Sequence, residues 1–152
     1  MIVADTPSVH ASAVLAGARA VLIRGPAGAG KSRLALALLD AADAGLLPFA
    51  RLVGDDRVQL EASHGRLLVR PAAALAGLIE VRGAGIRRLP HEPVAVVGLV
   101  VDLAAADAER LPAPADRETL ISGVPLARLA VASGADPLPA VLASLRIADT
   151  NL

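Results

Sequence analysis

The feature that most constrains this chain is a glycine-rich octapeptide that contains its one lysine. Of the fifteen lysine and arginine residues, only Lys31 is a lysine. It belongs to the segment Gly25-Pro26-Ala27-Gly28-Ala29-Gly30-Lys31-Ser32, which has the spacing G-x-x-x-x-G-K-[ST] of a phosphate-binding P-loop. In such a loop the backbone N–H groups surround phosphate oxygens. A compact ammonium fits beside the β- and γ-phosphates, whereas a planar guanidinium is too large and favours bidentate partners.

The residues on both sides of the octapeptide agree with this interpretation. Residues 20–23 form an apolar run typical of a buried strand, and residues 32–43 carry leucines at helical spacing. A helix there directs its N-terminal dipole at a bound anion. We therefore expect Lys31 to contact nucleotide phosphates and Ser32 to place its hydroxyl on Mg²⁺.

The remaining pattern predicts many short strands and few helices. Strands are expected at residues 9–15, 51–54, 58–60, 66–69, 79–82, 94–103, 119–122 and 126–131, and a closing helix at 138–147. Residues 104–116 have the composition of a loop. This order does not fit a regularly alternating doubly wound sheet. It predicts an α/β P-loop core with mixed or antiparallel strands, in a single domain spanning residues 1–152.

Composition excludes several classes of protein. Hydrophobic residues make up 55% of the chain and aromatic residues 1%, so Ala, Val, Leu and Ile must form the core. No apolar run approaches the ~20 residues of a membrane span. The formal net charge is zero, and the absence of a basic tract argues against nucleic acid as a partner. Arg87-Arg88, the one adjacent basic pair, is expected in a solvated turn.

The chain has no cysteine, which excludes disulfides and thiolate metal sites. There is no H-E-x-x-H motif, so a zinc site is not expected. Residues 1–5 lack the features of a signal peptide, and we expect a cytoplasmic protein. Asn151 is the only asparagine, so the Asn-Lys-x-Asp element with which GTPases read guanine cannot be present.

Three acidic residues lie within or directly after apolar segments. Asp55 and Asp56 end the strand expected at 51–54, where a P-loop enzyme places a carboxylate for Mg²⁺ or for its nucleophile. Because neighbouring side chains on a strand point to opposite faces, we expect the two aspartates to have different roles. The alternative is a turn formed with Arg57. Glu80 is flanked by aliphatic residues and is either a metal ligand or the partner of Arg82 in a structural ion pair.

Taken together, these segments resemble the bacterial HPr kinase/phosphorylase family. The resemblance rests on Val9-His10-Ala11, the octapeptide, Leu52-Val53-Gly54-Asp55-Asp56 and Glu80-Val81-Arg82-Gly83-Ala84-Gly85-Ile86. It runs from about His10 to Arg110 and covers the catalytic domain only, as in a short branch of the family. It implies a fold similar to that of HPr kinase and phosphoenolpyruvate carboxykinase. It also implies an ATP- and Mg²⁺-dependent serine kinase that acts on the phosphocarrier protein HPr and assembles as a hexamer.

The resemblance also assigns roles to residues. Lys31 would bind the β- and γ-phosphates, and Ser32 and Glu80 would hold Mg²⁺. Asp55 matches the general base that takes the proton of the target serine, and His10 matches an active-site histidine. Arg110 matches an arginine that stabilises charge on the transferred phosphoryl group.

Some positions depart from the family pattern. Arg33 replaces an acidic residue, Ala27 replaces a common serine, and Glu109 precedes Arg110 in place of aspartate. A segment linked to dephosphorylation falls near residues 130–135, and its final arginine is Ala135 here. We therefore expect kinase activity with weak or altered dephosphorylation. Two alternatives remain open: a P-loop kinase of the same fold that acts on another protein or a small hydroxylated molecule, and a non-catalytic ATP-sensing module.

Overall fold

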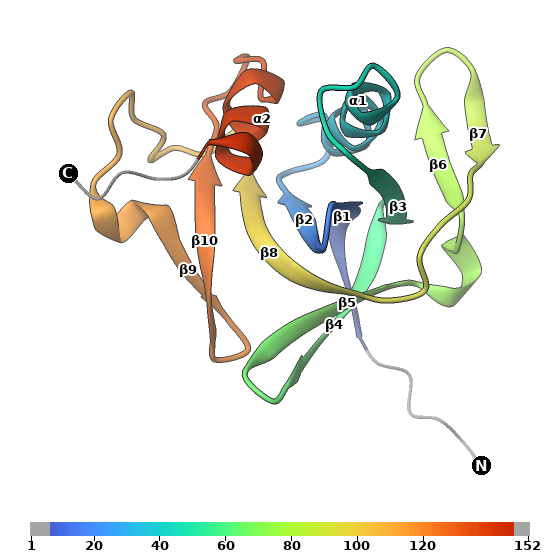
Figure 1. The fold of residues 1–152 in the computed structure, drawn as a ribbon, viewed down its shortest axis with the longest axis horizontal. Helices are drawn as coiled ribbons and strands as arrows, with labels where there is room; N and C mark the ends of the chain where they lie inside the picture. The colour runs from blue at the N-terminus through green and yellow to red at the C-terminus, as the bar shows by residue number, and fades with distance from the viewer. Residues whose placement is uncertain (1–6, 148–152) are drawn as a thin grey trace.

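A mixed β-sheet with two helices over one of its faces forms the centre of the molecule (Figure 1). The computed structural model describes residues 7–147, so the N-terminal segment and Asn151 discussed above lie outside the described residues. The strands are β1 (Ser8–Ala16), β2 (Arg19–Arg24), β3 (Ala50–Gly54), β4 (Arg57–Ser63), β5 (Arg66–Pro71), β6 (Leu78–Val81), β7 (Gly85–Arg88), β8 (Ala95–Asp102), β9 (Glu118–Ile121) and β10 (Val124–Ala130). The helices are α1 (Lys31–Asp43) and α2 (Leu138–Arg146), and residues Ala73–Leu75 and Pro114–Arg117 form short 3₁₀ turns.

Strands β1 and β8 each take part in two layers of the sheet. In the layer next to the helices the order is β3-β1-β2-β8-β10-β9. In the other layer, the start of β1 pairs with β4, β4 pairs with β5, and β5 pairs with the start of β8. Strands β2, β8 and β10 are parallel, and β3 runs in the same direction because both β2 and β3 are antiparallel to β1. The carboxyl ends of four strands therefore meet at one edge.

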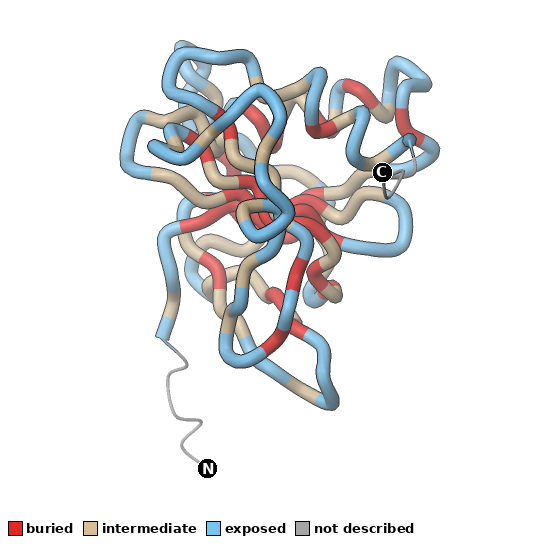
Figure 2. Tube along the Cα trace, turned by 90° about the vertical axis from the view of Figure 1, so that its left-hand side faces the viewer, coloured by how far each residue is buried: buried red, intermediate tan, exposed pale blue. Residues whose placement is uncertain are grey.

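Two apolar cores lie on the two faces of the central strands, and Figure 2 shows many of the buried residues gathered at the centre of the molecule. Along β2, Val21 and Ile23 pack toward the helices, where they join Leu34 and Leu38 of α1. Leu22 points to the other face, into the core shared with β4 and β5. Because both faces of β2 are covered, its sequence is a continuous apolar run rather than an alternating one. No helix within residues 7–147 is both long and apolar enough to cross a membrane.

The structure confirms a mixed α/β fold and corrects one local expectation. Arg87 and Arg88 do not lie in a turn: they belong to β7, which pairs with β6 in a two-stranded ribbon outside the main sheet. The turn of this ribbon is formed by residues 82–84, where Gly83 has φ +84°, a conformation that glycine adopts without steric cost. The glycine-rich segment is thus the turn of a hairpin, and the arginine pair lies on its exposed second strand.

Candidate active site

The octapeptide connects β2 to α1 at the edge where the parallel strands end. Gly30 has φ +99° and precedes the first helical residue, Lys31, so a residue without a side chain is favoured at this junction. A Cβ on Gly25 would lie 3.1 Å from Leu103 Cβ and 3.2 Å from Leu103 O. The Leu103 N–H also donates to Arg24 O at 2.8 Å. The loop therefore begins in close packing against the end of β8.

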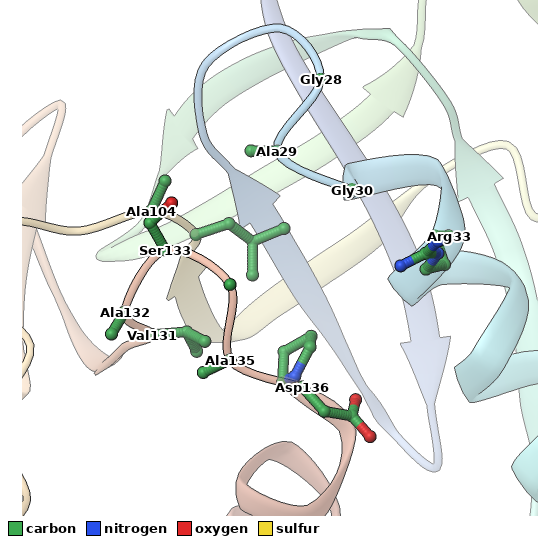
Figure 3. Close-up of a pocket in the computed structure, with 13 residues that line it drawn as sticks. Gly28, Ala29, Gly30, Arg33, Ala104, Val131, Ala132, Ser133, Ala135 and Asp136 are labelled. Carbon is green, nitrogen blue, oxygen red and sulfur yellow. The ribbon is translucent and has the colours of Figure 1, made fainter.

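The first residues of α1 point in different directions. Lys31 Nζ donates to Gly25 O at 2.7 Å and to Pro26 O at 3.1 Å, so the ammonium lies on the carbonyls of the loop itself. Ser32 Oγ lies 2.8 Å from both carboxylate oxygens of Asp55. Arg33 lines a cleft beside the loop (Figure 3). The lysine ammonium and the serine hydroxyl are thus both in the loop region.

Asp55 is the centre of the polar cluster next to the loop. It is only 3% exposed, and three donors satisfy its carboxylate. Ser12 Oγ donates to Oδ1 at 2.6 Å, Ser32 Oγ contacts both oxygens, and the Glu80 N–H donates to Oδ2 at 3.1 Å. These donors come from β1, α1 and β6, so three elements fix the position of one buried carboxylate. A buried charge is tolerated because it is hydrogen-bonded in this way.

Asp56 differs from Asp55, although not for the reason that the sequence suggested. Strand alternation cannot separate the two residues, because β3 ends at Gly54. The separation comes from the backbone turn at Asp56, which has φ +67°. The Asp56 side chain is 66% exposed and lies 4.0 Å from His10 Nδ1. Arg57 Nη2 lies 2.7 Å from His10 Nε2. Asp56 and His10 therefore form an exposed rim beside the buried Asp55.

Glu80 enters the site through its backbone. Its side chain is exposed, and within residues 7–147 it makes no ion pair with Arg82. The interpretation of Glu80 as the partner of Arg82 in a structural ion pair is therefore wrong. Arg82 lies beyond the end of β6, in the hairpin turn. No group of three or more His, Asp or Glu side chains in the described part of the chain is arranged to hold a metal. The Ser32 hydroxyl and the carboxylates of Asp55 and Glu80 are nevertheless oxygen ligands of the kind that suits Mg²⁺, which uses few protein ligands together with phosphates and water.

A second charged cluster supports the edge on which the loop rests. Arg24 donates to Asp102 from Nε at 2.7 Å and from Nη2 at 2.9 Å, and Arg128 Nε donates to the same carboxylate at 2.6 Å. Arg128 also binds Asp107. Burial alone raises the pKa of Asp102, but the hydrogen bonds from Arg24 and Arg128 outweigh burial and hold this pKa below its ordinary value. The pKa of Arg128 is raised by its hydrogen bonds to Asp107 and Asp102.

The structure does not bring Arg110 to the other predicted site residues. Arg110 is exposed in the segment that joins β8 to β9. This segment lies beyond β10 in Figure 1, on the far side of that strand from α1 and β3. His10, Lys31, Ser32, Asp55 and the Glu80 backbone, in contrast, all lie around the loop and the end of β3.

Sequence reasoning missed Ser12. This residue is fully buried in β1 and contacts both aspartates: its Oγ donates to Asp55 and accepts a longer, 3.4 Å hydrogen bond from the Asp56 N–H. One signal was present in the sequence. Ser12 is a hydroxyl inside the apolar run 11–16, and a buried hydroxyl requires a partner. Ser12 also lies two residues after His10, hence on the same side of the strand.

The fold and this site define a mixed α/β protein in which a glycine-rich loop lies beside a buried carboxylate. The same fold occurs in a solved structure described as the HPr(Ser) kinase/phosphatase from Coxiella burnetii. The two agree with a TM-score of 0.72 at 24% sequence identity, over 92% of this chain and 88% of the other.

The family follows from the sequence comparison. Residues 2–91 match the family model of the HPr serine kinase C-terminal domain, and the chain belongs to this family. It is also 42% identical over 84 residues to the HPr kinase/phosphorylase of three strains of Streptococcus thermophilus. That match covers 55% of this chain and 25% of the relative, so the chain matches about a quarter of the length of these curated relatives.

Proposed function

We propose that this chain is the catalytic domain of an ATP-dependent protein-serine kinase that phosphorylates the phosphocarrier protein HPr. The observation that carries the proposal is the contact of Ser32 with Asp55. It joins the hydroxyl that follows the P-loop lysine to a carboxylate at the end of β3. P-loop kinases place a metal-binding hydroxyl and a carboxylate together at this point. Membership of the HPr kinase family supports the choice of reaction and of acceptor.

In this proposal the loop N–H groups and Lys31 bind the nucleotide phosphates. Lys31 Nζ exchanges its two carbonyl contacts for β- and γ-phosphate oxygens, which it can reach because it already lies inside the loop. Ser32 and Glu80 would hold Mg²⁺, with Asp55 beside them, and a bound ion would supply positive charge against the phosphates. Phosphoryl transfer depends mainly on positioning and electrostatics, and Ser12 and the Glu80 N–H hold Asp55 in place for it.

The reaction is an in-line displacement. The acceptor serine oxygen forms a bond to the γ-phosphorus, the bond from that phosphorus to the bridging oxygen breaks, and ADP leaves. The serine proton passes to the Asp55 carboxylate. His10 lies on the exposed rim where the acceptor would approach. For Arg110 to stabilise charge on the transferred phosphoryl group, its segment has to approach Ser32. The rate of phosphate transfer by the variant Arg110→Ala tests this role.

The proposal also covers the reverse reaction, the oligomeric state and the cellular location. Ala135 offers no cation in the cleft beside the loop, and we expect release of pyrophosphate from phosphorylated HPr and phosphate to be weak or altered. Assembly as a hexamer and a cytoplasmic location follow from the family resemblance. Light scattering of the purified protein tests the hexamer.

The decisive experiment is incubation of the purified protein with ATP, Mg²⁺ and HPr, read by intact mass. We expect HPr to gain one phosphoryl group and HPr with its target serine changed to alanine to gain none. If the protein is incubated with a cell lysate and another protein gains phosphate while HPr gains none, that other protein is the acceptor in place of HPr. Binding of ATP with no phosphorylated product would favour the ATP-sensing module.

A further inference from the structure

A cleft of about 360 Å³ opens beside the glycine-rich loop (Figure 3). One wall is formed by Gly28, Ala29 and Gly30, and the opposite wall by residues 131–137, which lead into α2. Hydrogen bonds fix the second wall: the Val131 N–H donates to Asp102 O at 2.8 Å and the Ala105 N–H donates to Val131 O at 2.9 Å. The cleft is therefore a built feature, and its volume falls in the range of small-molecule sites.

Among the described residues that line the cleft, one carries a positive charge. The lining consists mainly of glycine, alanine and valine, with Arg33 and Asp136 as its two charged residues. Asp136 is an anion whose Oδ1 accepts the Leu138 N–H at 3.1 Å, so it cannot itself bind a phosphate. Arg33 is exposed and makes no hydrogen bond or ion pair with any other residue in the range 7–147. The guanidinium is thus available to an anionic ligand.

The geometry of α1 determines which side of the helix Arg33 occupies. Successive residues of an α-helix point about 100° apart, so Lys31, Ser32 and Arg33 cover three sides of the first helical turn. Lys31 faces the loop carbonyls and Ser32 faces Asp55, which is the side proposed for the β- and γ-phosphates. Arg33 faces the third side, which is the cleft. A nucleotide whose terminal phosphates lie at Lys31 has to extend its α-phosphate and nucleoside away from Asp55, and the cleft offers that space.

We propose that Arg33 binds the α-phosphate of the nucleotide and that the cleft holds the nucleoside. This inference rests on the proposed function, since it places the nucleotide by its terminal phosphates. It adds a binding residue beyond the P-loop motif, on a side of α1 that is turned by about 100° from the side that faces the buried carboxylate. Arginine suits this position because its planar fork binds phosphate oxygens in a bidentate manner.

The test is a set of binding constants for ATP, AMP and adenosine, measured by calorimetry on the purified chain. We expect Arg33→Gln to weaken the binding of ATP and of AMP by about tenfold each, as for the loss of one charge-assisted hydrogen bond. The binding constant of adenosine is expected to stay unchanged. Arg33→Lys keeps the charge and is expected to lose less. Lys31→Ala is expected to weaken the binding of ATP much more than the binding of AMP. The matched control is Arg66→Gln, which removes the same charge from an exposed position at the start of β5.

The outcomes separate the inference from the function on which it rests. If the wild type binds ATP and phosphorylates HPr, and Arg33→Gln binds ATP and AMP as tightly as Arg66→Gln does, the assignment of Arg33 is overturned and the kinase stands. An equal loss for adenosine would place Arg33 on the nucleoside and overturn the phosphate contact. If ATP binding depends on Arg33 as described but HPr receives no phosphate, the nucleotide site stands and the kinase fails. A thermal melt of Arg33→Gln that matches the control excludes unfolding as the cause of any loss.

Discussion

Ser12→Ala removes a single hydroxyl from the centre of the site. The Ser12 side chain is fully buried, and its Oγ donates to Asp55 Oδ1 at 2.6 Å. The substitution leaves Asp55, itself 3% exposed, with the Ser32 hydroxyl and the Glu80 N–H as donors. It also removes the acceptor of the Asp56 N–H. Alanine is nearly isosteric with serine, so the effect is expected to come from the hydrogen bonds rather than from a cavity.

The size of the effect follows from the nature of the contact. A hydrogen bond to a charged group contributes about 1.5–3 kcal/mol, and the second contact, at 3.4 Å, adds little. We expect Ser12→Ala to lower the free energy of unfolding by about 2 kcal/mol. For a chain of this size that corresponds to a melting temperature lower by roughly 4–8 °C. Because the carboxylate loses one of its fixed donors, the rate of phosphate transfer is expected to fall while ATP affinity changes little.

The assay is thermal unfolding at neutral pH, with Ser144→Ala as the control. Ser144 is exposed on α2 and its Oγ donates to Ala140 O within the helix, so its loss is expected to have little effect. A double-mutant cycle with Asp55→Asn then isolates the contact: the loss caused by Ser12→Ala is expected to shrink when Asp55 carries no charge. The reasoning is refuted if Ser12→Ala melts at the same temperature as Ser144→Ala, or if the two substitutions are simply additive.

Three further predictions concern the loop, the second charged cluster and the reverse reaction. Lys31→Arg is expected to reduce phosphate transfer to HPr by about 100-fold or more, nearly as far as Lys31→Ala, because the ammonium lies inside the loop; near-normal turnover of the arginine variant would show that the loop accepts a guanidinium. Asp102→Asn is expected to lower the free energy of unfolding by about 2 kcal/mol at pH 6. The pKa of Asp102 is lowered in the folded chain, so its contribution is full above its ordinary value of 3.8 and is lost as the pH falls below it; melting curves whose separation does not narrow below about pH 4 would contradict this. Finally, release of pyrophosphate from phosphorylated HPr is expected to be much slower than the forward reaction. Comparable rates would show that alanine at position 135 does not weaken the reverse reaction.

Local patterns in the sequence predict much of the fold. The continuous apolar run of β2, the octapeptide and the leucine spacing of α1 are properties of neighbouring residues, and the structure has the expected strand, turn and helix there. The strands expected at residues 58–60 and 66–69 are β4 and β5, which pair as a hairpin with its turn at residues 64–65. The mixed sheet followed from the number and order of strands. The ribbon of β6 and β7 was only half predicted, because β7 is exposed and carries no apolar periodicity.

The site was less predictable because its contacts join distant parts of the chain. Ser12 and Asp55 are 43 residues apart and Asp55 and the Glu80 N–H are 25 apart, and no local pattern encodes such pairs. The different environments of Asp55 and Asp56 depend on one backbone angle at Asp56, not on strand alternation. Glu80 contributes a backbone N–H to the cluster, which the identity of its side chain does not reveal. The family resemblance selected several of these residues, and the structure shows what each of them contacts.

The most direct measurement for the central claim compares wild type and Asp55→Asn in two assays on the same samples. One assay gives the dissociation constant of ATP and the other gives the rate of phosphate transfer to HPr. If Asp55 is the base of a kinase, the variant is expected to bind ATP within a few-fold of wild type while transfer falls by about 100-fold or more. Undiminished transfer by Asp55→Asn, or ATP binding by the wild type with no phosphorylated HPr, would contradict the account.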